Sequence, residues 1–191
     1  MVPTLCRTLG VKGHRPLVGT RDDKDLLYVF ASVNCVDGRL HTRTLPSRAN
    51  VLRAARLAGR RQQVSKTRRM QRAFAAHLRQ AGRAYPAHAH RRVVLIIDNA
   101  PWHRGAPIRA ALAANPHLQL YRLPAYSPQL NVIERLWKVL RRRATHNRLF
   151  DTLADLKRSV RAGLRYFQTV RNRVMSLLGG CYGKRTVSGG S

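Results

Sequence analysis

The feature that most constrains the fold is an uninterrupted apolar run, VVLII at residues 93–97, which ends directly at Asp98. Four of its five residues are β-branched, so it predicts a strand, and a continuous apolar run is typical of a strand buried on both faces. A helical segment, APIRAALAAN, and a second β-rich run, LQLYRLP, follow it. Strand, helix and strand predict a parallel βαβ unit, and therefore an α/β fold.

Further elements are expected on the N-terminal side of this unit. Two β-rich runs at residues 26–35 and 39–45 flank Asp37 and Gly38, and an Asp-Gly step between such runs is a strong hairpin signal. Residues 47–82 are very basic and carry apolar side chains at helical spacing. These segments predict a mixed sheet flanked by helices.

The C-terminal part is expected to be helical. One helix follows Pro124, and either Asp151 or Thr152 can cap a further helical stretch that closes at Gly179. We expect one domain over residues 1–178 and a flexible tail over 179–191. The apolar stripe that predicts the first of these helices consists of Ile133, Leu136, Trp137, Leu140 and Ala144.

The charge of the chain points to a polyanionic partner. Its 191 residues contain 37 Lys and Arg but only 8 Asp and Glu, which gives a formal net charge of +29. Nucleic acid is the expected counter-charge, although a GC-rich genome would also raise the Arg content. An acidic membrane surface is the rival partner, but no amphipathic segment favours it over core packing.

Three scattered cysteines without a CxxC pair predict a reduced, cytoplasmic chain, associated with the nucleoid in a bacterium. No signal peptide or membrane span is expected, because no apolar stretch approaches the roughly 20 residues that a span needs.

Asp98 and Glu134 are the acids with the most informative positions. Ligands of open α/β sheets bind at the carboxyl ends of strands, where Asp98 lies. A turn or helix cap would also explain this residue, although Asn99 could fill that role as well. Glu134 falls at the edge of a predicted apolar helix stripe and can face a cleft; capping with Asn131 or pairing with Lys138 are the structural alternatives. Together the two carboxylates can converge on a divalent metal ion, although such sites normally take three or more.

Two motifs carry a family resemblance. IIDNAPWHRG followed by LPAYSPQLNVIERLWKVLRR resembles the DDE superfamily of transposases, in the branch of mariner-type elements and related bacterial insertion sequences. Thirty-five residues separate Asp98 from Glu134, an interval of the kind that this family keeps between its second and third acids. The resemblance reaches from about residue 7 to residue 165.

This resemblance implies a ribonuclease H-like fold, magnesium or manganese as cofactor, and DNA cleavage and strand transfer in transposition. Asp98 and Glu134 would be catalytic metal ligands. His103 would either contact DNA phosphate or hold the loop. The other residues expected to bind DNA are Lys138, Arg141, Arg142 and Arg143.

The chain departs from the family pattern at the first acid. The family places this aspartate on an opening strand, but here no acid precedes Asp22. Asp22, Asp23 and Asp25 are expected in a polar turn, and Asp37 at a hairpin tip. We therefore expect that the opening strand is missing and that the chain alone is inactive or nearly so. A homodimer or an upstream fragment would have to supply the first aspartate.

Two other functions remain compatible with the sequence. One is a non-catalytic basic nucleic-acid-binding protein, in which the two acids are structural. The other is a metal-dependent nuclease that cuts DNA without joining strands. A zinc site built from His88, His90 and a distant cysteine has the wrong spacing for a strong motif.

Overall fold

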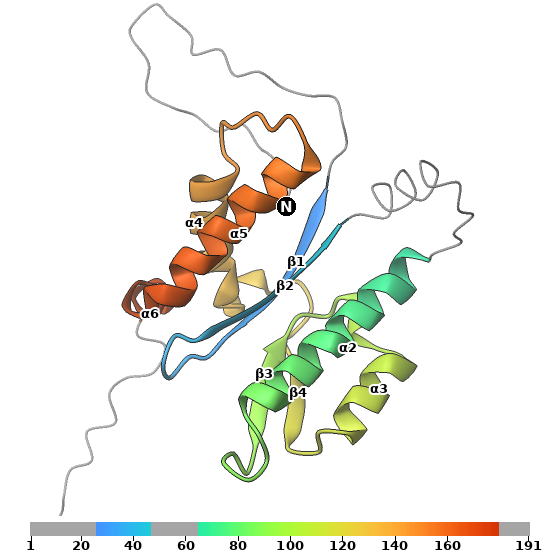
Figure 1. The fold of residues 1–191 in the computed structure, drawn as a ribbon. Helices are drawn as coiled ribbons and strands as arrows, with labels where there is room; N and C mark the ends of the chain where they lie inside the picture. Colours follow the sequence, from blue (N-terminus) through green and yellow to red (C-terminus); the bar gives the residue numbers. More distant parts are fainter. Residues whose placement is uncertain (1–25, 47–64, 180–191) are drawn as a thin grey trace, which may run out of the picture.

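The computed structural model of the chain describes residues 26–46 and 65–179 (Figure 1). The first part of the helix predicted over residues 47–82, the turn predicted around residues 22–25 and most of the predicted tail lie outside these ranges. In chain order, the elements are β1 (Leu27–Val33), β2 (Leu40–Pro46), α2 (Lys66–Ala84), β3 (Val93–Ile97), the 3-10 helix η1 (Pro101–His103), α3 (Ala106–Ala113), β4 (Leu118–Arg122), the 3-10 helix η2 (Pro128–Leu130), α4 (Ile133–Ala144), α5 (Leu153–Thr169) and α6 (Arg171–Leu178).

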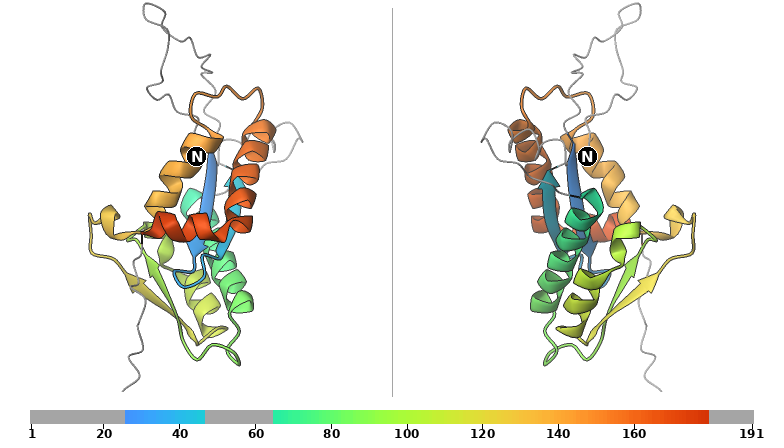
Figure 2. Two further views of the ribbon diagram at one scale, coloured as in Figure 1. Left: turned by 90° about the vertical axis from the view of Figure 1, so that its left-hand side faces the viewer. Right: turned by 90° about the vertical axis from the view of Figure 1, so that its right-hand side faces the viewer.

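Strands β1 and β2 form the predicted antiparallel hairpin, in a register that runs from Leu27 opposite Pro46 to Val33 opposite Leu40. Its turn needs Gly38, which has φ +71° and lies so close to α6 that a Cβ would be 2.8 Å from a backbone oxygen there. The hairpin lies between α4 and α5 on one side and α2 on the other (Figure 2). It is therefore the layer that connects the two groups of helices.

Strands β3 and β4 pair in parallel, with Val93 opposite Leu118 and Ile97 opposite Arg122, and α3 connects them. This arrangement confirms the predicted βαβ unit. Within the described residues, β1–β2 and β3–β4 hydrogen bond as two separate pairs rather than as one continuous mixed sheet. The fold is α/β, as the sequence predicts.

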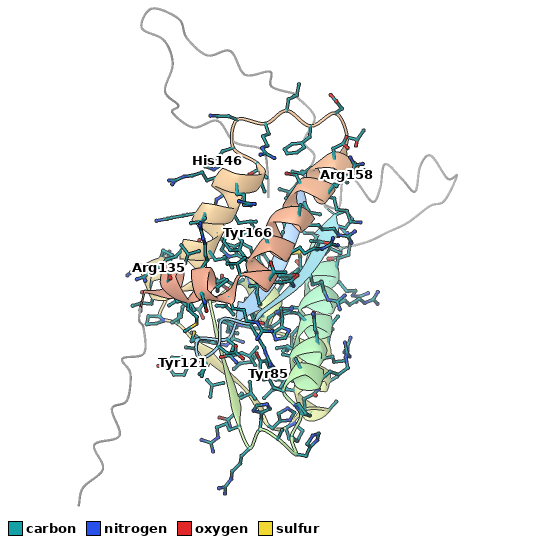
Figure 3. All side chains as sticks on the ribbon, turned by 60° about the vertical axis from the view of Figure 1, so that its left-hand side comes forward. Tyr85, Tyr121, Arg135, His146, Arg158 and Tyr166 are labelled. Carbon is teal, nitrogen blue, oxygen red and sulfur yellow. The ribbon has the colours of Figure 1, made fainter. Side chains whose placement is uncertain are left out.

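The prediction that β3 is buried on both faces is wrong. Ile97 on the inner face is buried against α2 and α3, but Val94 is 53% exposed and Ile96 is 50% exposed. Tyr121 on β4, opposite Ile96, is 61% exposed and extends from the same open face (Figure 3). An apolar run shows that a strand suits a buried position, but it does not show which elements cover each face.

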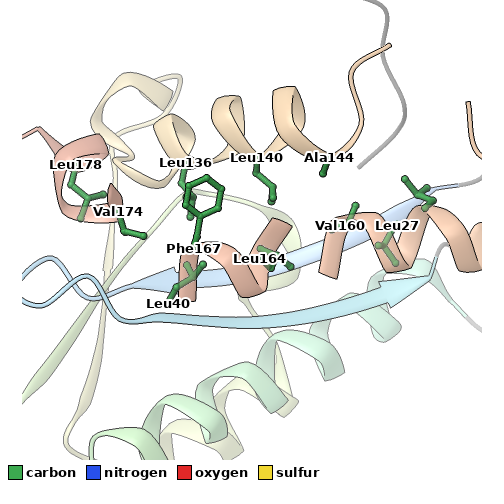
Figure 4. Packing of buried hydrophobic residues seen from close by; sticks show 11 residues of the cluster. Leu27, Leu40, Leu136, Leu140, Ala144, Val160, Leu164, Phe167, Val174 and Leu178 are labelled. Carbon is green, nitrogen blue, oxygen red and sulfur yellow. The ribbon is translucent and has the colours of Figure 1, made fainter. Parts of the chain in front are cut away.

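Two hydrophobic cores lie on opposite faces of the hairpin. Leu27 and Leu40 pack with α4, α5 and α6, around Phe167 (Figure 4). Phe30 faces the other way and packs with α2, α3 and β3, around Phe74. We call these the α4–α6 core and the α2–α3 core. The alternation of side chains along β1 thus places one strand in both cores.

The C-terminal helices differ from the prediction in one respect. Thr152 is the N-cap of α5, where its Oγ1 accepts a hydrogen bond from the backbone N–H of Asp155 at 3.1 Å. The predicted single helix breaks at Val170 into α5 and α6, and α6 ends at Gly179 in the left-handed conformation. Within the described ranges, no helix has the length and apolar character that crossing a bilayer requires.

Candidate active site

Asp98 and Glu134 line the same pocket, which has a volume of about 150 Å³. Its walls come from the loop after β3, the loop after β4 and the start of α4. The two acids that the sequence singled out, with 35 residues between them in the chain, therefore line one pocket. The complete lining is Asp98, Asn99, Leu123, Pro124, Tyr126, Ser127, Pro128, Asn131 and Glu134.

One oxygen of Asp98 is held by its own loop. Oδ1 accepts a hydrogen bond from the backbone N–H of Ala100 at 3.0 Å, which is the turn interaction that the sequence left open. The same Oδ1 lies 3.1 Å from His103 Nδ1. Oδ2 has no hydrogen bond within the described residues, and the side chain is 59% exposed. Asp98 can therefore serve the turn with one oxygen and offer the other to a ligand.

His103 holds the loop of Asp98 in place through hydrogen bonds and ring packing. Its Nδ1 also lies 3.2 Å from the backbone oxygen of Asp98, and because both neighbouring oxygens only accept, Nδ1 carries the proton. The ring is 8% exposed and packs on Phe74, with 4.1 Å between ring centroids. Arg122 Nη2 donates to the backbone oxygen of His103 at 3.0 Å. These contacts fit the loop-holding role that the sequence left open for His103.

Hydrogen bonding also sets the charge state of Asp98. The hydrogen bond from His103 lowers the pKa of the Asp98 carboxyl below its ordinary value, partial burial opposes this effect, and the backbone N–H of Ala100 supports it. Asp98 is thus ionised at neutral pH, in the form that binds cations.

The loops after β3 and β4 are tied together. Asn99 Nδ2 donates to the backbone oxygen of Leu123 at 2.6 Å, and the N–H of Leu123 donates to Ile97 at 2.9 Å. Across the pocket, Tyr126 has φ +56° and a fully exposed side chain. The wall that carries Asp98 is therefore fixed by side-chain and backbone bonds, whereas the part near Tyr126 faces solvent.

Glu134 lies in the first turn of α4, where a negative charge interacts favourably with the helix dipole. Its backbone N–H donates to Asn131 O at 3.0 Å. Within the described residues, its carboxylate makes neither the capping bond with Asn131 nor the ion pair with Lys138 that would explain it structurally. Glu134 thus presents a half-buried carboxylate to the pocket.

The basic residues of α4 do not form one uniform surface. Lys138 and Arg142 are exposed and lie one and two turns after Glu134, on the same side of the helix. Arg141 is half-buried. The guanidinium of Arg143 lies 3.9 Å from the ring centroid of Tyr166 on α5, so this residue is engaged in a cation–π contact.

In residues 26–46 and 65–179, no three His, Cys, Asp or Glu side chains are grouped closely enough to hold a metal ion. The only acids of the pocket lining are Asp98 and Glu134. Asp37 lies at the hairpin turn as predicted, where it accepts a hydrogen bond from the N–H of Arg39. Asp22, Asp23 and Asp25 lie outside the described residues.

Sequence reasoning missed the residues that support the site. Phe74 belongs to a helical apolar stripe, which predicts burial but not contact with His103, 29 positions away. Arg122 and Leu123 follow β4, and nothing in their local sequence indicates that they fasten the loop of Asp98. The carboxyl ends of neighbouring parallel strands were the signal that could have found them.

Known proteins share both sequence and fold with this chain. A family model described as DDE superfamily endonuclease matches residues 12–157. The uncharacterized protein y4pE/y4sA of Sinorhizobium fredii is 34% identical over 84 residues, which cover 44% of this chain and 58% of that protein. The insertion element IS630 uncharacterized 39 kDa protein of Shigella sonnei is 33% identical over 69 residues, which cover 36% of this chain and 20% of that protein.

Solved structures of the Mos1 transposase extend the comparison. The Mos1 mariner paired end complex with Mn is 16% identical, with a TM-score of 0.56, and the match covers 94% of this chain and 50% of that one. The Mos1 paired-end complex with the left transposon end gives 15% identity and a TM-score of 0.52, over 93% of this chain and 52% of that one. This chain thus spans about half of the length of these proteins and shares their ribonuclease H-like fold. Because the family model matches about three quarters of its residues, the chain belongs to the DDE superfamily endonuclease family, as its two motifs predict.

Proposed function

We propose that this chain is the catalytic domain of an insertion-sequence transposase, which cleaves DNA and transfers strands in a metal-dependent reaction. The observation that carries the proposal is the shared pocket of Asp98 and Glu134. The loop after a strand and the start of a later helix bring together two carboxylates, and within the described residues Asp98 Oδ2 and the Glu134 carboxylate have no other partner. The relatives from an insertion element and from Mos1 support the same function. We assign residues 1–178 to this domain.

The donor set fits magnesium or manganese. Asp98 Oδ2 and the Glu134 carboxylate are hard oxygen donors, and no cysteine lines the pocket. These two residues would hold the ion. A divalent ion at such a site activates an attacking oxygen and stabilises a leaving one in phosphodiester chemistry.

The neighbouring residues then have distinct tasks. His103 acts as a positioning residue, because it is buried and orients Asp98 through Nδ1. Lys138 and Arg142 extend from Glu134 along α4 and would contact the phosphates of the bound strand. Arg141 and Arg143 would contribute mainly through the overall positive potential.

We further propose that the described residues form an incomplete metal site. Two carboxylates hold a divalent ion weakly, and small geometric errors at such a centre cost about a hundredfold in rate. A third carboxylate would have to come from outside the described residues, and we propose that a second copy of the chain or a separate polypeptide supplies it. The 191-residue chain by itself would then cleave DNA very slowly.

The test compares the 191-residue chain with Asp98→Asn and Glu134→Gln, which keep size and remove charge. Binding of Mn²⁺ is measured by titration calorimetry, and nicking and joining of labelled duplex DNA are followed on gels. We expect each substitution to weaken Mn²⁺ binding at least tenfold, whereas Asp151→Asn, an exposed acid at the start of α5, should leave it unchanged.

The outcomes separate the three functions. Equal Mn²⁺ affinity in wild type and both variants would refute the metal site and leave a basic nucleic-acid-binding protein. Rapid nicking without strand joining would favour a nuclease. Rapid cleavage with joining by the 191-residue chain would support the transposase and contradict the incomplete site.

A further inference from the structure

A second, larger cavity lies at the outer edge of strand β2. It has a volume of about 540 Å³ and is enclosed by α5 on one face of the hairpin and the end of α2 on the other. Strand β2 hydrogen bonds only to β1 within the described residues, so this edge is not covered by another strand. We call it the arginine groove; its lining is Thr42, Arg43, Thr44, Gln80, Arg83, Arg161, Leu164, Arg165 and Gln168.

The groove concentrates positive charge without any internal counter-charge. Four arginines from three elements line it, and no carboxylate among the described residues does. The acids of the described ranges lie elsewhere. Asp98 and Glu134 line the smaller pocket described above, which we call the acid pocket. The others are Asp37 in the hairpin turn, and Asp151 and Asp155 at the start of α5. Four guanidinium groups around one cavity repel one another, and a bound anion would relieve this repulsion.

One of these arginines contains an unsatisfied donor. Arg43 Nε is buried and has no hydrogen-bond partner within the described residues, which is costly for a charged group. The neighbouring Gln168 is already engaged, since its Nε2 donates to Leu40 O at 3.1 Å. The groove therefore combines a fixed wall with the exposed guanidinium groups of Arg161 and Arg165, and the unsatisfied Nε of Arg43 adds uncompensated charge beneath it.

The lining chemistry selects the kind of anion. Arginine and threonine side chains are typical phosphate contacts, and planar guanidinium groups bind phosphate oxygens in a bidentate manner. The lining contains no aromatic ring on which an unpaired base could stack. These features favour the backbone of a duplex over a single strand.

We propose that the arginine groove is a second DNA site, which binds the phosphate backbone of duplex DNA. It shares no lining residue with the acid pocket. In Figure 2 the groove elements α5 and β2 lie on one side of β1, and the loops after β3 and β4 lie on the other. A duplex in the groove is thus held apart from the strand at the acids. This inference rests on the proposed action on DNA.

Arg161 and Arg165 allow a clean test, because both are exposed and lie one turn apart on α5. The double variant Arg161→Gln/Arg165→Gln is compared with Arg91→Gln/Arg92→Gln, which removes the same charge from an exposed segment before β3. Affinity for a fluorescent duplex is measured by anisotropy over a salt series in EDTA, so that metal binding at the acids plays no part.

We expect the groove variant to lose about tenfold in affinity. The negative slope of log K against log salt should become about 2 less steep, because each lost phosphate contact removes about 0.9 from its magnitude. The control variant should stay within about twofold of wild type. Equal losses in both variants would refute the groove site and leave the proposed function intact. If wild type binds no duplex even at low salt, the proposed function itself fails. A competition experiment tests acidic protein as the ligand instead: polyglutamate and unlabelled duplex, at equal charge, each compete with the labelled duplex. If polyglutamate displaces the label more strongly than duplex does in wild type, but not in the groove variant, the groove binds acidic protein and the inference is overturned.

Discussion

Asp98 and Glu134 line one pocket, but the elements that carry them pack in different hydrophobic cores. Asp98 follows a strand of the α2–α3 core, and its Oδ1 is bonded to His103 and Ala100. Glu134 begins a helix of the α4–α6 core, and within the described residues its carboxylate has no partner. One wall of the pocket is thus organised in advance, whereas ordering Glu134 on a cation would cost side-chain entropy that Asp98 has already lost.

This difference shows how the site depends on the fold. The hairpin is the shared layer of the two cores, since Phe30 packs on one side and Leu27 on the other. Disturbing the α2–α3 core should therefore disturb Asp98 directly through His103. Disturbing the α4–α6 core should change stability more than it changes the shape of the Asp98 loop.

The largest effect is expected from removing one aromatic anchor in each core. Phe74 and Phe167 are 4% and 2% exposed, so Phe74→Ala and Phe167→Ala should each lower the free energy of unfolding by about 3 to 5 kcal/mol. Chemical denaturation with guanidinium chloride measures both losses. Only Phe74→Ala should also weaken Mn²⁺ binding in the folded protein, because His103 packs on that ring.

Phe74→Leu is the milder companion, in case the alanine variant does not fold. It keeps most of the volume but removes the flat ring under His103, so Mn²⁺ binding should still weaken. Equal Mn²⁺ affinity in the Phe74 and Phe167 variants would show that the two cores do not support the acids differently.

The sequence predicts the order of most elements from local patterns, and its two motifs predict, through the family resemblance, that Asp98 and Glu134 share one site. Apolar periodicity identifies the helices, and the position of Asp98 after a strand predicts a ligand site. Both motif acids were found because strand ends and helix starts converge in an α/β fold.

Features that depend on distant segments could not be predicted. The exposure of Val94 and Ile96 depends on which elements cover β3, and the break at Val170 occurs without Gly or Pro. The arginine groove draws its lining from β2, α2 and α5, so no single stretch of sequence reveals it.

The next effect is a loss of folding stability at acid pH, and it arises on α2, a helix of the α2–α3 core. His77 in α2 is 2% exposed, and burial, followed by the positive charges of His41 and Arg43, lowers its pKa from 6.5 to about 4. Between these values the unfolded chain binds a proton that the folded chain does not, so stability falls as pH falls from 6.5 to about 4. At 1.36 kcal/mol per pKa unit the loss is about 3 kcal/mol.

Unfolding by guanidinium chloride at a series of pH values measures this loss. His77→Gln should remove most of the dependence, because an amide does not titrate. Ser32→Ala is the control: it removes the hydroxyl 3.1 Å from His77 Nε2 but keeps the buried imidazole, so the pH dependence should persist. An unchanged slope in His77→Gln would contradict the assignment.

The smallest of these effects isolates the Asp98 wall without damaging either core. His103→Ala removes the Nδ1 donor that orients the carboxylate, and the loss of such an orienting partner typically costs tenfold to a hundredfold in metal affinity. Titration with Mn²⁺ should show this weakening, while Gln71→Ala, which removes only the bond from Gln71 Nε2 to the backbone oxygen of Arg104, should bind as wild type does.

His103→Asn decides between orientation and packing. The asparagine amide can still donate to Asp98, but the variant lacks the ring that packs on Phe74. It should therefore recover part of the Mn²⁺ affinity if the hydrogen bond matters. No recovery, together with normal affinity in a variant that keeps the ring but loses the donor, such as His103→Phe, would assign the effect to stacking. In that case Asp98 would be placed by the α2–α3 core alone, and its difference from Glu134 would lie in packing rather than in hydrogen bonding.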